Sequence, residues 1–296
     1  MNPEKIGMIG LGTMGWQMAA NLCRAGHSVL AYDIEVPRRE KFSREFSTEA
    51  PRHLADLAAA SIVITMLPNG AVVRQALTDG GDASLVNTLE PGSVVLDTTS
   101  SVPAGTREMG ALLARRGVGM VDAGVSGAVV GATEGNLVFM IGGEDAAVER
   151  VQPVLSILGK RMFRMGPLGS GHAMKAMNNL VSAAGFAAAC EALIIGRRVG
   201  LDPAAMIEVF NASTGRNFST EKSMGKIAAG TFDTSFSLGL FAKDVKIAAD
   251  LADEAAFPSP ISHAVCDWMA EARDNLGGER DHTVAYTYWD AKRTRE

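Results

Sequence analysis

The chain has 296 residues, 47% of them hydrophobic and 21% charged, which is enough for two domains with an ordinary globular composition. A formal net charge of −5 argues against a nucleic-acid partner, because phosphate recognition needs a basic surface. The three cysteines, Cys23, Cys190 and Cys266, lie far apart and form no CxxC motif. They predict no disulfide framework and suit a reducing compartment, so we expect a cytoplasmic protein.

The first half of the chain alternates apolar runs with segments of helical spacing. The runs predict strands over 5–10, 28–33, 61–67, 93–97, 119–124 and 137–143. They are nearly continuous in apolar residues, as expected for parallel strands that are covered on both faces. The alternation predicts an α/β domain over residues 1–165, built on a doubly wound parallel sheet.

Strand signals stop after Gly166, and helical patterns continue to the end of the chain. They predict helices over 171–199, 203–213, 219–229, 238–256, 260–275 and 281–292. We therefore expect an all-α domain over residues 166–296. Its first helix is apolar around most of its circumference but contains Glu191, so it is interpreted as a buried helix and not a membrane span. Burying that helix completely would need a second subunit, which predicts a homodimer or homotetramer.

A glycine-rich turn follows the first predicted strand and opens a helix, the order found in Rossmann-type dinucleotide-binding domains. The turn comprises Gly10, Leu11, Gly12, Thr13, Met14 and Gly15. Gly10 would make the tight turn, Gly12 would admit a pyrophosphate, and Gly15 would let the helix pack on the strand. The second strand ends at Asp33, which can accept hydrogen bonds from a ribose and would repel a 2′-phosphate. NAD is the predicted cofactor, although Arg38 and Arg39 leave NADP possible.

Four blocks, in this order, make the whole chain resemble the β-hydroxyacid dehydrogenase family. They are GLGTMGWQMAANL (10–22), DAGVSGAVVGATEGNLVFMIGG (122–143), GSGHAMKAMNNL (169–180) and LFAKDVKIAADLA (240–252). Three positions depart from the family pattern. Gly124 stands in place of a proline, Ala128 in place of a glycine, and His172 in place of a glutamine or similar polar residue. The departures at Gly124 and Ala128 concern the identity of the substrate and not the type of chemistry.

The resemblance implies a role for residues in both predicted domains. Lys175 would be the acid/base, and Asn179, one helical turn later on the same face, would orient the substrate. Ser126, Gly127 and Ala128 would hold the substrate carboxylate. The cofactor would contact Met66, Leu67, Pro68, Ser100 and Lys243. Taken alone, Lys175 would more often be a solvated lysine at a helix end, and the turn at residues 126–128 could be an ordinary strand-end turn.

These residues suit hydride transfer between a nicotinamide and a small hydroxy acid, with a lysine that moves the hydroxyl proton. No metal is expected, because the five histidines form no ligand motif. The main hypothesis is an NAD-dependent dehydrogenase of a 3-hydroxy acid that resembles 3-hydroxyisobutyrate. Two alternatives remain open: an NADPH-dependent reductase of a semialdehyde, and a dinucleotide-binding sensor without turnover. A 6-phosphogluconate type of dehydrogenase ranks lower, because it needs a longer helical domain.

Overall fold

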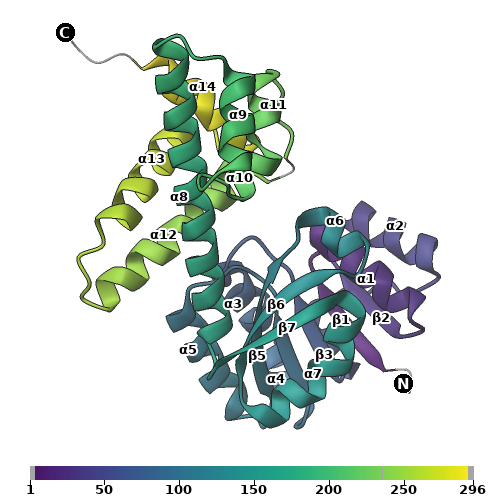
Figure 1. The fold of residues 1–296 in the computed structure, drawn as a ribbon. Coiled ribbons are helices and arrows are strands. Elements are labelled where there is room, and N and C mark those ends of the chain that lie inside the picture. Colours follow the sequence, from purple (N-terminus) through teal and green to yellow (C-terminus); the bar gives the residue numbers. More distant parts are fainter. Residues whose placement is uncertain (1–3, 235, 293–296) are drawn as a thin grey trace. The chain divides into compact units, whose positions relative to one another are not determined.

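The computed structural model describes residues 4–234 and 236–292. The chain divides into two compact units, Met1–Lys175 and Ala176–Glu296. The first unit contains the sheet, and the second is helical (Figure 1). The predicted combination of an α/β domain followed by helices is confirmed.

The first unit is built on a sheet with the strand order β2-β1-β3-β4-β5-β6-β7. The strands are β1 (Lys5–Ile9), β2 (Ser28–Tyr32), β3 (Ile62–Thr65), β4 (Val94–Asp97), β5 (Gly119–Ser126), β6 (Leu137–Gly143) and β7 (Gly159–Gly166). The first five strands pair in parallel, so their carboxyl ends meet at one edge of the sheet. This edge is where doubly wound sheets bind ligands.

The far side of the sheet departs from the purely parallel prediction. β6 pairs antiparallel with β5, because the short connection through residues 127–136 cannot make the crossover that a parallel neighbour requires. β7 was not predicted. It is an edge strand that contains Lys160, Arg161 and Arg164 and is largely exposed, so it lacks the apolar run that identifies the buried strands.

Helices cover both faces of the sheet, and each strand sends alternate side chains to each face. On β1, Met8 packs into one core cluster with Met18 and Leu22 of α1, whereas Ile9 packs into the other. The helical segments of this unit are α1 (Thr13–Arg24), α2 (Val36–Phe46), η1 (Leu54–Ala59), α3 (Gly70–Thr78), η2 (Gly81–Ala83), α4 (Leu85–Thr88), α5 (Pro103–Ala114), α6 (Ala128–Thr133) and α7 (Asp145–Leu158). This arrangement confirms the doubly wound architecture.

The second unit is organised around the long helix α8 (Ser170–Arg198), which begins in the first unit. The helical segments that follow it are α9 (Pro203–Ala212), α10 (Phe218–Lys222), α11 (Met224–Ala228), α12 (Leu238–Glu254), α13 (Pro260–Leu276), η3 (His282–Val284) and α14 (Ala285–Ala291). The helix predicted over 219–229 is therefore two short helices. The helix predicted over 281–292 begins with the 3-10 turn η3. Asp202 caps α9, because its carboxylate accepts a hydrogen bond from the backbone N–H of Ala205 at 3.0 Å.

Helix α8 is long and apolar enough to cross a membrane by length and composition, but core helices of soluble proteins pass the same test, and half of its most apolar window is buried inside the structure. Phe186 and Leu193 lie in the core of the second unit with Phe241 and Trp289. Val181 and Ile195 on the same helix are exposed, at 73% and 53%. The helix thus has one face in the core and one apolar face outside it.

Candidate functional site

The glycine turn after β1 is packed so closely that two of its positions accept only glycine. Gly10 has a φ of 99°, and a Cβ there would lie 2.3 Å from the carbonyl oxygen of Met66. At Gly15 a Cβ would lie 2.0 Å from the carbonyl oxygen of Gly10, so only glycine lets α1 approach the strand so closely. A Cβ on Gly12 would meet nothing within 4 Å, and Gly12 is exposed at the N-cap of α1, where backbone N–H groups can bind an anion. Thr13 is exposed and Met14 half-buried on the same turn, whereas Leu11 is buried.

Asp33 is buried beside this turn and supports it. Its carboxylate accepts hydrogen bonds from the backbone N–H groups of Leu11, at 2.8 Å, and Glu35, at 2.9 Å. Arg38 bridges Asp33 and Glu35 with ion pairs of 3.3 and 2.9 Å. Arg39 lies over the ring of Tyr32. Both arginines that could have met a 2′-phosphate are therefore already engaged.

Two further predicted cofactor segments lie at the same edge of the sheet. Met66, Leu67 and Pro68 directly follow β3, and Ser100 follows β4. Thr99 joins these segments, because its hydroxyl accepts a hydrogen bond from the backbone N–H of Leu67 at 3.1 Å. The parallel register of β3 and β4 brings these segments together, although they are more than 30 residues apart.

The predicted substrate turn follows β5 and is conformationally unusual. Ser126 is the last residue of the strand, Gly127 has a φ of 131°, and Ala128 has a φ of 53°. Ala128 therefore occupies the left-handed region where glycine is favoured and where the family pattern has glycine. A left-handed non-glycine residue typically costs about 1 kcal/mol or more and occurs most often at functional sites.

Lys175 lies next to β5, and the departure at Gly124 makes room for it. A Cβ on Gly124 would come within 2.6 Å of the Lys175 Cβ and 3.1 Å of the Gly171 carbonyl oxygen. Gly124 and Ser126 are two residues apart on one strand and so share a face of the sheet. The first unit thus brings the predicted proton-transfer lysine to the strand that carries the predicted substrate turn.

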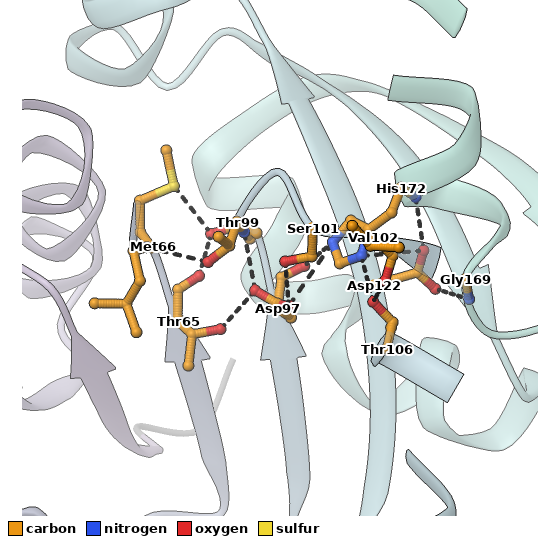
Figure 2. A network of polar contacts seen from close by, with 12 residues as sticks. Thr65, Met66, Asp97, Thr99, Ser101, Val102, Thr106, Asp122, Gly169 and His172 are labelled. Atoms are coloured by element: carbon orange, nitrogen blue, oxygen red, sulfur yellow. Dashed lines mark hydrogen bonds and ion pairs between the residues drawn. The ribbon is translucent and has the colours of Figure 1, made fainter. Parts of the chain in front are cut away.

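A buried polar network at this edge was not predicted (Figure 2). Asp97 at the end of β4 and Asp122 within β5 are 1% and 0% exposed, and the ring of His172 lies between them. Both aspartates interrupt otherwise apolar strand sequences, a signal that sequence analysis could have used, since a charge in a buried strand needs a partner.

The remaining predicted residues, Asn179 and Lys243, lie in the second unit, where Asp244 connects them. The Asn179 amide donates to Asp244 at 2.6 Å, and the Lys243 ammonium pairs with the other carboxylate oxygen at 3.2 Å. Asn178 donates to the Asn179 carbonyl oxygen at 3.2 Å. Asp244, which is 3% exposed, was not singled out from the sequence, although it stands beside Lys243 in the fourth block.

The described part of the chain has no cluster of side chains suited to bind a metal ion. Within residues 4–234 and 236–292, no group of three or more His, Cys, Asp or Glu side chains is placed to hold a metal ion. The polar residues at the edge of the sheet instead hold one another and the backbone.

Comparison with known proteins identifies the family. The NAD-binding domain of 6-phosphogluconate dehydrogenase matches residues 5–166, and the NAD-binding domain of NADP-dependent 3-hydroxyisobutyrate dehydrogenase matches residues 169–289. The chain belongs to the β-hydroxyacid dehydrogenase family. As a member, it is an NAD(P)-dependent oxidoreductase that acts on a hydroxy acid, as the sequence predicted.

Individual relatives of this family match over nearly the full length. The chain is 34% identical to 2-(hydroxymethyl)glutarate dehydrogenase of Eubacterium barkeri, over 97% of this chain and 95% of the relative. It is 31% identical to L-threonate dehydrogenase of Cupriavidus necator, over 95% of each chain. The structure of 3-hydroxyisobutyrate dehydrogenase from Mycobacterium tuberculosis with L-serine has a TM-score of 0.89 and 29% identity, covering 98% of this chain and 100% of that one.

Proposed function

We propose that this enzyme oxidises a small 3-hydroxy acid of the form HOCH2–CHX–COO⁻, with Lys175 as acid/base and NAD as the preferred oxidant. The close packing of Lys175 on Gly124 carries the proposal, because it holds the lysine on the strand that ends in the Ser126 turn. The substrate form is the one shared by 2-(hydroxymethyl)glutarate, 3-hydroxyisobutyrate and L-serine, which the names of relatives contain.

The proposed step moves one proton and one hydride. NAD supplies the hydride acceptor when it is bound. The neutral amine of Lys175 takes the proton of the substrate hydroxyl while the hydrogen on the same carbon leaves as hydride, and the C–O bond becomes a carbonyl. In the reverse direction the Lys175 ammonium returns the proton to the carbonyl oxygen.

The substrate carboxylate is proposed to bind at the turn formed by Ser126, Gly127 and Ala128. A hydroxyl and backbone N–H groups there can donate hydrogen bonds to an anion without adding a bulky side chain. The left-handed Ala128 places a methyl group where a glycine would leave space. We therefore expect Ala128 to restrict the group X. Asn179, whose amide is held by Asp244, stays a proposed substrate contact.

The preference for NAD follows from the charges around Asp33. Two carboxylates, Asp33 and Glu35, oppose a 2′-phosphate, and Arg38 is already paired with both. Binding NADP would require Arg38 to leave these partners and the phosphate to approach the buried carboxylate of Asp33. The glycine turn, Met66, Leu67, Pro68, Ser100 and Lys243 are proposed to complete the cofactor site.

A substrate panel tests the function directly. The acids 3-hydroxyisobutyrate, 2-(hydroxymethyl)glutarate, L-serine and L-threonate, and tartronate and succinic semialdehydes, are assayed at 340 nm with NAD(H) and NADP(H) in parallel. We expect the highest kcat/KM with NAD and with an acid in which the carbon that bears the carboxylate also bears a CH2OH group. Faster turnover of a semialdehyde with NADPH would favour the reductase, and NADH binding without any turnover would favour a sensor.

We also propose that the enzyme is a cytoplasmic homodimer or homotetramer that buries the exposed face of α8 against a second copy. Val181, Ala188 and Ile195 are exposed and spaced by seven residues, so they form one stripe on the helix. The solution mass of the unmodified protein and of the Val181→Lys variant tests this. A monomer at micromolar concentration would contradict it, and a smaller mass for the variant supports it.

A further inference from the structure

His172 is enclosed by two carboxylates at the edge of the sheet in the first unit. Its ring nitrogen Nε2 lies 3.9 Å from an Asp97 carboxylate oxygen, and Nδ1 lies 3.9 Å from an Asp122 carboxylate oxygen. Nδ1 is also 2.9 Å from the Thr106 hydroxyl, and Nε2 is 3.3 Å from the Asp97 carbonyl oxygen. A carbonyl oxygen can only accept, so the Nε2–H donates to Asp97, while Nδ1 shares a hydrogen bond with the Thr106 hydroxyl.

The Asp122 side of this network determines where α8 begins. The carboxylate of Asp122 accepts hydrogen bonds from the backbone N–H groups of Gly169 and His172, each at 2.7 Å. It therefore caps the first turn of α8 from a strand 47 residues earlier, and the negative charge suits a helix N-terminus. Lys175 lies three residues after His172 on the same helix, where it packs on Gly124.

The Asp97 side determines the path of the loop after β4. Asp97 accepts hydrogen bonds from the backbone N–H of Thr99 at 2.9 Å and from the Ser101 hydroxyl at 3.3 Å. The Thr65 hydroxyl donates to the same carboxylate at 2.8 Å and connects it to β3. Figure 2 shows Thr99 and Ser101 anchored on Asp97. These two residues flank Ser100, a proposed cofactor contact.

We propose that His172 is a positioning residue that couples the Ser100 loop to the turn of α8 that carries Lys175. The inference rests on the proposed function of Lys175. The ring contacts Asp97 of β4, Thr106 of α5 and Asp122 of β5, so it joins these elements to the start of α8 (Figure 2). Loss of the ring would allow α8 to shift relative to the loop, and misplacement of a catalytic group by about 1 Å can cost on the order of 100-fold in rate.

The test compares His172→Leu, which cannot hydrogen-bond, with His172→Gln, which keeps one donor and one acceptor. We measure kcat and KM with NAD and 3-hydroxyisobutyrate, or the panel acid that the unmodified enzyme oxidises fastest, together with NADH affinity by fluorescence and Tm. We expect His172→Leu to lower kcat about 10- to 100-fold with NADH affinity nearly unchanged. His172→Gln should recover most of the loss. His27→Gln is the matched control, since His27 is buried in the same unit but lies at the amino ends of the strands, against Glu4.

A double-mutant cycle distinguishes positioning from a general structural role. If His172 acts through Lys175, His172→Leu should cost less than 2-fold when added to Lys175→Ala. Equal losses in both backgrounds, or an unchanged kcat for His172→Leu, would overturn the inference while leaving Lys175 as the acid/base. A Lys175→Ala enzyme with normal kcat would overturn the proposed function as well.

Should His172→Leu not fold, Thr106→Val gives a second test. It removes only the hydroxyl beside Nδ1 and should lower kcat about 3-fold. An unchanged kcat for Thr106→Val would count against the coupling.

Discussion

The two units hold their candidate functional residues by different physical means. In the first unit the backbone does most of the positioning. Glycines permit a tight turn, and buried carboxylates in or directly after strands accept hydrogen bonds from backbone N–H groups. In the second unit the positioning comes from side chains on packed helices, where Asp244 of α12 holds Asn179 of α8 and its neighbour Lys243. Where the backbone holds a residue, a change in side-chain shape should disturb its position. Where a side-chain pair holds it, a change in charge should do so. The predictions below test this difference.

The largest effect is expected at Lys175, near the end of the first unit. Lys175→Ala should lower kcat by about 10²–10⁴-fold, because general acid–base assistance is lost. Lys175→Arg should also be slow, since a guanidinium does not give up its proton at working pH. NADH affinity should change little, because the glycine turn is unaltered. The control is Lys160→Ala on the exposed strand β7. Normal turnover of the alanine variant would remove Lys175 from the mechanism and make Lys243 the next candidate.

The second prediction tests backbone-dependent positioning through shape alone. Gly124→Ala adds a Cβ that would lie 2.6 Å from the Lys175 Cβ, so α8 or the lysine must shift. We expect kcat to fall about 10-fold, with NADH affinity maintained. Gly105→Ala is the matched control, because a Cβ there meets nothing within 4 Å, and it should stabilise α5 by about 0.8–1 kcal/mol. Equal kinetics for the two variants would show that the Gly124 contact does not matter.

The third prediction tests charge-dependent positioning in the second unit. Asp244→Asn keeps the side-chain shape but removes the charge that Asn179 and Lys243 share. It should destabilise the second unit by about 1–3 kcal/mol in urea unfolding and raise the KM for NAD several-fold. The control is Asp250→Asn on the same helix, whose ion pair with Lys246 is largely exposed and worth about 0.3–0.5 kcal/mol. Similar losses for both variants would contradict a special role for Asp244.

The smallest effect concerns the pH dependence of stability in the same unit. His282 is enclosed by Phe186, Phe236 and Phe241, and burial lowers its pKa below 6.5, against the opposing influence of Asp281 and the Phe236 carbonyl. The unfolded chain therefore binds this proton more readily, so stability should fall as pH drops below about 6.5. The measurement is Tm from pH 8 to 5.5 for wild type and His282→Gln.

An internal control for this prediction has the opposite sign. Hydrogen bonding to Ser259, with nearby acidic groups, raises the pKa of the exposed His263. The protonated His263 therefore adds to the free energy of unfolding at low pH, and this contribution is lost as the pH rises. His263→Gln should therefore make the acid-side loss slightly steeper, whereas His282→Gln should make it shallower. Identical slopes for wild type and His282→Gln would show that His282 does not titrate in this range.

The sequence by itself determined the features that depend on neighbouring residues. Apolar runs and helical spacing identified the strands of the parallel part of the sheet and the helices of the second unit, since both periodicities are local. The glycine turn, Asp33 and the four family blocks were also readable, and they predicted the family and its chemistry correctly. The functional roles of Lys175, Asn179 and Lys243 stay predictions.

Only the tertiary structure decided which distant residues meet. The antiparallel direction of β6 depends on the length of its connection to β5, and β7 forms because it lies at the edge of the sheet. Neither depends on a run of apolar residues. His172 contacts Asp97 across 75 residues, and Asn179 contacts Asp244 across 65. These polar groups are expensive to bury alone and stable only when paired. The aspartates in apolar strands signal that a partner is needed, but the pairing exists only once the strands and helices have packed, so no local pattern identifies which residue the partner is.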